Sequence, residues 1–266
     1  MSSLPGGIVE DGHRHRGFSF KPLTGAVELA IQEAARQADS IAGQVSHLLT
    51  LALADVGGAE PTGDRVRSLS VGDRQFLMRR LALLLGLNHT WIRAECDTCH
   101  ARFDFSVEQS RLPVKEASAG YPFARAATSL GECLFRVPTG ADQETVAEVD
   151  DEGQALHDLV AMCLVSGTEY PERFTPEDLS SVEDALEKCA PEVALFAQAS
   201  CPDCGVENRV YLDPYSCLQT TKGTLLSEVH SIASTYHWSE HEILGLSRAR
   251  RLQYLELIDR ARGMTH

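Results

Sequence analysis

The chain has 266 residues, 43% of them hydrophobic, which is enough to bury one substantial core or two smaller ones. Its 38 acidic residues outnumber 24 basic ones and give a formal net charge of -14. Such a surface repels nucleic acid and anionic lipid, because both are bound through Lys and Arg. No apolar run approaches the roughly 20 residues that cross a bilayer, and no basic region precedes an apolar stretch at the N-terminus. We therefore expect a cytoplasmic protein that has no membrane anchor and does not bind nucleic acid.

Residues 1–95 are predicted to begin with an extended segment and to continue as helices. Phe18 and Phe20 alternate with polar neighbours, as in a half-buried strand. Ser70 has Asp73 three residues later, in the spacing of a capping box, and a helix is expected to start there. An earlier helix is indicated by apolar residues at helical spacing, namely Val45, Leu48, Leu49, Ala52 and Val56.

Two CxxC pairs are the most specific feature of the sequence, and their cysteines are Cys96, Cys99, Cys201 and Cys204. A shift of 105 positions superposes the second pair on the first and places an alternating strand pattern after both. Zinc favours four tetrahedral thiolates in structural sites, and one CxxC turn supplies two of them. We therefore predict a split zinc ribbon, formed by residues 96–112 and 201–217, which holds one structural zinc ion per chain.

The long separation between the pairs leaves other arrangements open. Zinc ribbons usually have about 15 to 20 residues between their pairs, whereas residues 100–200 intervene here. Two separate metal sites that use His100 or Cys217 are one alternative. A thioredoxin-like redox pair is disfavoured, because that motif places one CxxC at a helix N-terminus and both pairs here precede strand patterns.

Residues 113–200 are predicted to form a mainly helical insertion in the ribbon. Cys163 and Cys189 lie on apolar helical faces, and Cys133 alternates with Phe135 on a strand pattern, so these three thiols are expected in the core. The predicted fold class is α+β, mainly helical, with a split four-cysteine zinc ribbon, a long helical insertion, and helical N- and C-terminal regions.

No motif supports catalysis. The sequence lacks HExxH, the HxE of zinc deaminases, a P-loop, a dinucleotide-binding glycine pattern and GxSxG. Four thiolates fill the coordination shell of zinc, whereas a zinc-dependent hydrolase needs an open position. We therefore predict that the chain is not an enzyme.

Residues 218–266 are predicted to form a helical docking region. Aromatic residues and arginines together are typical of protein interfaces. The expected partner-binding residues are Tyr236, Trp238, Arg248, Arg250, Arg251 and Tyr254. The alternative is a small helical core in which all the aromatic side chains are internal.

This C-terminal region resembles the ending of a family of contractile-tail proteins from bacteriophages and related injection systems, grouped with the baseplate hub proteins of T-even phages. Further stretches occur in the order expected of that family: "LPGGIVEDGHRHRGFSFKPLTG", "VRSLSVGDRQFLMRRL", "CDTC", "FRVPTGADQE" and "CPDCG". The resemblance implies a structural or assembly role without catalysis. It also implies baseplate, hub or spike proteins as partners, incorporation in a tail or injection particle, and the four CxxC cysteines as metal ligands. His100 departs from the glycine expected after the first pair.

A different class of function remains as a rival. A zinc-ribbon regulator that binds nucleic acid through a C-terminal helix-turn-helix-like element would also account for the cysteines and the final helices. Arg248, Arg250 and Arg251 could then contact phosphate. The acidic total charge disfavours this interpretation.

Overall fold

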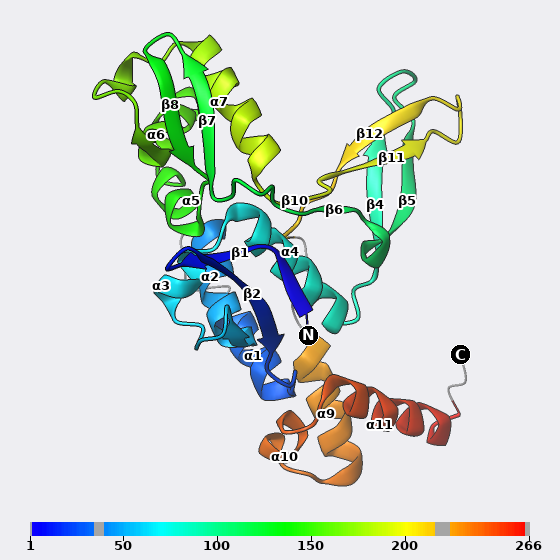
Figure 1. The fold of residues 1–266 in the computed structure, drawn as a ribbon. Coiled ribbons are helices and arrows are strands. Elements are labelled where there is room, and N and C mark those ends of the chain that lie inside the picture. The colour runs from blue at the N-terminus through cyan, green and yellow to red at the C-terminus, as the bar shows by residue number, and fades with distance from the viewer. Residues whose placement is uncertain (1, 35–39, 216–223, 264–266) are drawn as a thin grey trace.

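The structure is a computed structural model, and residues 2–34, 40–215 and 224–263 of it are described. Figure 1 shows a central N-terminal body from which three other parts extend. One is the inserted body with β7 and β8, the second is a pair of hairpins with β4, β5, β11 and β12, and the third is a group of C-terminal helices.

The N-terminal body combines an antiparallel sheet of order β1-β2-β3 with four helices. Its elements are β1 (Ser2–Glu10), β2 (His13–Phe20), α1 (Gly25–Ala34), α2 (Ile41–Ala52), β3 (Leu53–Val56), α3 (Gly63–Arg67) and α4 (Val71–Leu84). Leu4 from β1, Leu49 from α2 and Leu77 from α4 are fully buried in its core. The sheet and the helices therefore share one hydrophobic core.

The side chain of Asp73 links the first strand to the start of α4 by hydrogen bonds. Its carboxylate accepts the backbone N–H groups of Gly6 at 2.7 Å and Gly7 at 2.9 Å. Ser70 caps the helix as predicted, because its hydroxyl accepts the N–H of Asp73 at 3.1 Å. The carboxylate also accepts the Ser70 hydroxyl at 2.8 Å, but its backbone donors belong to a distant strand and are buried.

The inserted body contains a three-stranded antiparallel sheet covered by helices. Its elements are β7 (Phe123–Thr128), β8 (Gly131–Arg136), α5 (Gly140–Val146), α6 (Glu152–Cys163), β9 (Leu164–Ser166), the 3-10 helix η2 (Pro171–Arg173) and α7 (Pro176–Cys189). Cys133, Cys163 and Cys189 are buried among the apolar side chains of this core. Their predicted role as core residues is confirmed.

A short strand pair, the neck, joins the inserted body to the hairpins. It consists of β6 (Val114–Lys115) and β10 (Glu192–Val193), which pair antiparallel. Pro191, beside β10, packs against Gly72 of α4, where a Cβ atom would lie 2.0 Å from the Pro191 carbonyl oxygen. The backbones of α4 and the neck therefore touch at a position where only glycine fits.

The substitution Gly72→Ala is expected to destabilise the protein by about 1–3 kcal/mol, because the new methyl group overlaps a backbone carbonyl. The direction of the change in unfolding free energy is diagnostic, since Gly→Ala in an unobstructed helix stabilises a protein by about 1 kcal/mol. Urea unfolding would measure it. Gly63→Ala in α3 is the control, because its Cβ would meet only the Arg67 side chain at 3.5 Å. A stabilised Gly72→Ala protein would contradict the contact.

Asp178 links the start of α7 to the β7–β8 turn and contributes stability that acid removes. Hydrogen bonds from the Ser129 hydroxyl, the Thr175 N–H and the Ser129 N–H lower the pKa of Asp178 to about 2. A carboxyl whose folded pKa lies below its unfolded value of about 4 stabilises the fold above pH 4, and this contribution is lost as the pH falls towards 2.

We therefore expect Asp178→Asn to be less stable than the wild type at about pH 5 and to approach it at about pH 2. Urea midpoints at the two pH values would measure this difference. Asp184→Asn, on the exposed side of the same helix, should track the wild type at both. A difference between Asp178→Asn and the wild type that does not change with pH would contradict the assignment.

The hairpins form two separate two-stranded sheets. The first pairs β4 (His89–Glu95) with β5 (Arg102–Glu108), which is followed by the 3-10 helix η1 (Gln109–Arg111). The second pairs β11 (Phe196–Ser200) with β12 (Glu207–Tyr211). Figure 1 shows the two hairpins lying across each other at a distance from the helices.

The C-terminal helices pack against the first helix of the chain. They are α9 (Thr224–Tyr236), α10 (Glu240–Leu244) and α11 (Arg248–Ala261). Leu225, Ile232 and Ile258 form their core, and Leu29 of α1 packs against it. Helix α1 and the C-terminal helices therefore share one structural unit.

The predicted fold class is wrong. The described residues contain ten α-helices and twelve strands arranged in five small antiparallel sheets, so the chain is mixed and not mainly helical. The insertion in particular carries its own three-stranded sheet. The four cysteines do cluster, but they lie on two hairpins that belong to separate sheets and do not form a clear ribbon. The division into domains remains a prediction. Across the described ranges, no helix is both long and apolar enough to cross a membrane.

Candidate metal centre

The four predicted ligands come together at the tips of the two hairpins. Their sulfur atoms all lie within 4.8 Å of one another. The sulfur atoms of Cys96 and Cys204 are 3.6 Å apart, and so are those of Cys99 and Cys201. Four thiolates that each lie about 2.3 Å from a tetrahedral zinc ion are about 3.8 Å apart. The cluster could therefore hold a metal ion of this size with little movement.

The two turns that carry the cysteines have the same backbone structure. In the first turn the Cys96 N–H donates to the carbonyl of Ala101 at 3.0 Å, and the His100 N–H donates to the carbonyl of Cys96 at 2.9 Å. The second turn repeats both hydrogen bonds at 2.9 Å, with every residue number raised by 105. The sequence register between the two pairs is thus also a structural register.

His100 occupies the position at which the second turn has a glycine. Its φ angle is 58°, and that of Gly205 is 75°, so both residues adopt the left-handed conformation. This conformation costs a non-glycine residue about 1–2 kcal/mol. The departure from glycine therefore adds strain to the first turn but does not change its shape.

Burial and backbone dipoles distinguish the ligands. Cys96 and Cys201 are buried, whereas Cys99 and Cys204 are exposed. The backbone N–H groups of Cys99 and Thr98 lower the pKa of Cys96 to about 6. The thiolate is the form that binds metal, so at neutral pH this ligand is prepared for binding.

Asn208 supports the site and was not identified from the sequence. It is buried, its side-chain oxygen accepts the N–H of Asp97 at 3.0 Å, and its amide donates to the carbonyl of Val206 at 2.9 Å. It therefore connects the two CxxC turns by hydrogen bonds. In the sequence, this polar residue occupies the same alternating set of positions as Val210 and Leu212, whose side chains face inward.

The site can do little besides hold a metal. Four sulfur ligands complete a tetrahedral shell and leave no position for a substrate or an activated water. His100, offered as a ligand for a second site, is not part of the cluster, and Cys217 lies outside the described residues.

No protein-family model, curated protein or solved structure matches the chain.

The predicted partner-binding residues divide into two groups. Tyr236, Trp238 and Tyr254 pack against one another, with ring centroids 4.9 to 5.5 Å apart, at the edge of the C-terminal core. Each ring is only half-buried, so part of this aromatic group remains on the surface.

The arginines differ in their accessibility. Arg251 is 0% exposed, and its guanidinium lies 2.9 Å from both Glu28 and Glu228. Its predicted place on a partner-facing surface is therefore corrected to an internal ion pair. Arg248 is partly exposed and lies 3.4 Å from Glu28, whereas Arg250 is exposed.

Proposed function

We propose that the four cysteines bind one structural zinc ion per chain. The observation that carries this proposal is the set of four converging sulfur atoms on two matched turns. Thiolate-only sites favour soft or borderline metals, and zinc is the usual occupant of a closed tetrahedral site. The ion would join two hairpins that share no backbone pairing, and its role is therefore structural.

We further propose that the chain is a structural or assembly component of the baseplate or hub of a contractile phage tail or phage-like injection system. The ordered sequence stretches that resemble that family support this role. A closed metal site and an acidic surface are consistent with a protein that acts through contacts with other proteins. The partners are other baseplate, hub or spike proteins, and the protein is incorporated in the particle or assists its assembly.

The exposed side of α11 is the proposed docking surface. Arg250 and Leu257 lie two helical turns apart on one face, and both are exposed. We expect Arg250→Glu and Leu257→Asp each to reduce the amount of protein that co-purifies with tail particles from the native cell. Lys188→Glu, an exposed charge reversal on α7, is the control. The proposal is lost if the wild-type protein never associates with tail components.

The nucleic-acid-binding alternative has weaker support. Two of its three candidate arginines, Arg248 and Arg251, already lie beside Glu28. The same Arg250→Glu variant separates the two functions. A loss of DNA binding together with unchanged particle assembly would favour the regulator.

A further inference from the structure

Three arginines are buried in the described part of the chain, and one of them has no acidic partner. Arg251 pairs directly with two glutamates, and Arg74 reaches Glu144 through the hydroxyl of Ser46. Arg79, at 7% exposure, donates only to backbone carbonyls, of Leu112 at 3.0 Å and of Pro113 and Ala194 at 3.4 Å. Burial lowers the pKa of its guanidinium.

A buried guanidinium without a carboxylate is unusual, because a buried charge is normally paired. The carbonyls of Leu112 and Pro113 accept from Nη1 and that of Ala194 accepts from Nη2, so these contacts use at most three of the five N–H groups. Arg79 is therefore a cation with spare donors in an otherwise acidic protein.

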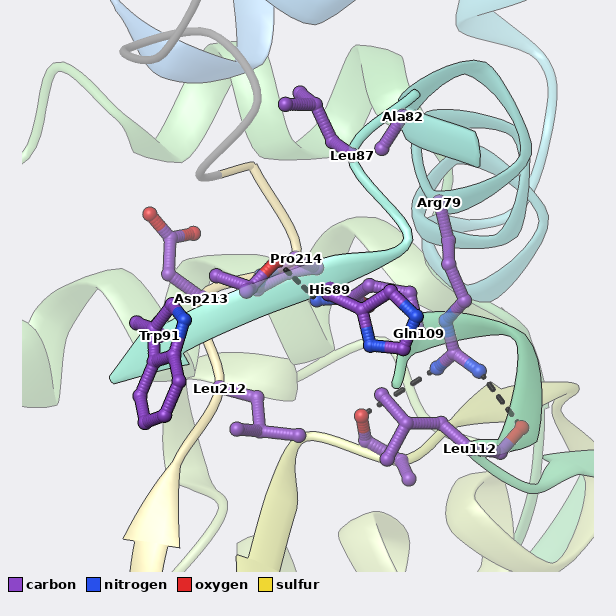
Figure 2. A pocket seen from close by; sticks show the side chains of 12 residues that line it. Arg79, Ala82, Leu87, His89, Trp91, Gln109, Leu112, Leu212, Asp213 and Pro214 are labelled. Carbon is purple, nitrogen blue, oxygen red and sulfur yellow. Dashed lines mark hydrogen bonds between the residues drawn. The ribbon is translucent and has the colours of Figure 1, made fainter. Parts of the chain in front are cut away.

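Arg79 lies beside a cavity of about 250 Å³ between the end of α4, the start of β4 and residues 212–214. Figure 2 shows its guanidinium at one end of the cavity, near His89, and Trp91 at the other end. Trp91 is 72% exposed. Arg79 and an exposed indole ring therefore line the same cavity.

The cavity's own carboxylate is not directed at Arg79. Asp213 points away from the guanidinium in Figure 2, and its Oδ1 accepts the N–H of Tyr215 at 2.8 Å. Much of the remaining lining is apolar and includes Leu87, Leu112 and Leu212.

We propose that this cavity binds a carboxylate group attached to a short aliphatic chain, with the carboxylate on Arg79 and the aliphatic part between the leucines and Trp91. The planar guanidinium matches a carboxylate in a bidentate arrangement. A phosphate dianion fits less well, because its larger desolvation cost requires more donors, and Arg79 is the sole Arg or Lys that the described residues contribute to the lining. The carboxylate comes from a free small acid or from the C-terminal end of a partner chain.

The chain has two tryptophans, so Trp238→Phe leaves Trp91 as the only indole reporter. In this full-length background we would titrate 4-methylpentanoate, its amide, inorganic phosphate, and the peptide acetyl-Gly-Gly-Leu as acid and as amide. We expect a saturable blue shift of Trp91 emission with the acids and not with the amides. Tighter binding of the acidic peptide than of 4-methylpentanoate would identify the C-terminal end of a partner chain as the source of the carboxylate. Tighter binding of 4-methylpentanoate would identify a free small acid.

Arg79→Met should weaken binding of the acids by about tenfold or more. Arg80→Met makes the same change of charge at the next, exposed residue of α4 and should bind normally. Thr90→Phe fills the cavity from β4 without altering Arg79, so it should also abolish binding even if Arg79→Met folds poorly. The inference is overturned if no probe saturates, if amides bind as well as acids, if phosphate binds more tightly, or if Thr90→Phe has no effect.

Discussion

Replacing Cys201 by Ser is expected to release the metal and to destabilise the hairpin pair by several kcal/mol. Binding of structural zinc contributes on the order of 10 kcal/mol and is coupled to folding, so the loss of one of four ligands removes much of that contribution. Among the described residues, no hydrogen-bonded sheet joins the hairpins. Their other links are the Asn208 side chain and a small apolar cluster that includes Phe103 and Ala199. The zinc content measured by elemental analysis should fall from one ion per chain towards zero. In the Trp238→Phe background, the urea transition followed by Trp91 emission should move to a lower urea concentration.

The matched control for this experiment is Cys163→Ala, which removes a buried thiol from the core of the inserted body. It should keep one zinc ion per chain and lose only the stability expected of a small core truncation. Full zinc content in Cys201→Ser, or loss of zinc in Cys163→Ala, would contradict the ligand assignment.

Replacing Arg251 by Ala is expected to destabilise the protein by about 3–5 kcal/mol, because it leaves buried carboxylates without a counter-charge. Glu28 comes from α1 and Glu228 from α9, so the substitution should loosen the C-terminal helices from the N-terminal body. Urea unfolding followed by Trp238 emission in a Trp91→Phe background would measure the change.

Arg250→Ala, at the exposed neighbouring position, is the control and should change stability by at most about 0.5 kcal/mol. The triple variant Arg251→Met, Glu28→Gln, Glu228→Gln should recover much of the loss, because it removes the buried charges together. Equal stability of Arg251→Ala and Arg250→Ala would refute the role of the ion pair.

Local signals in the sequence predicted local structure. The helix cap at Ser70 and the core positions of Cys133, Cys163 and Cys189 are confirmed. The convergence of the CxxC pairs could be predicted because the two turns repeat one pattern. Strand patterns are visible in the sequence at Phe18, at Cys133 and after both CxxC pairs, but β3, β6, β9 and β10 are too short to show a sustained alternation. The apolar run that predicted a helix as far as Val56 ends as helix at Ala52 and continues directly as β3.

Long-range electrostatics could not be predicted in the same way. The spacing of arginines in the last helix does not reveal that Arg251 faces Glu28, 223 positions earlier. Nor does any pattern near Arg79 reveal that its partners are carbonyls. Burial of a charged side chain depends on which elements pack together, and the mixed fold was not anticipated.

The separation of the two half-sites has a consequence for the order of folding. Closing a loop of 105 positions costs about 1.5 kcal/mol more than closing the 15 to 20 residues of an ordinary ribbon. Pairing of β6 with β10 at the neck uses no metal ligand and places Val114 beside Val193, so that once the neck has formed only a shorter loop remains to be closed. Metal uptake should then follow folding of the insertion. Substitutions that weaken the neck, far from any sulfur atom, should therefore lower metal affinity while both CxxC turns remain intact.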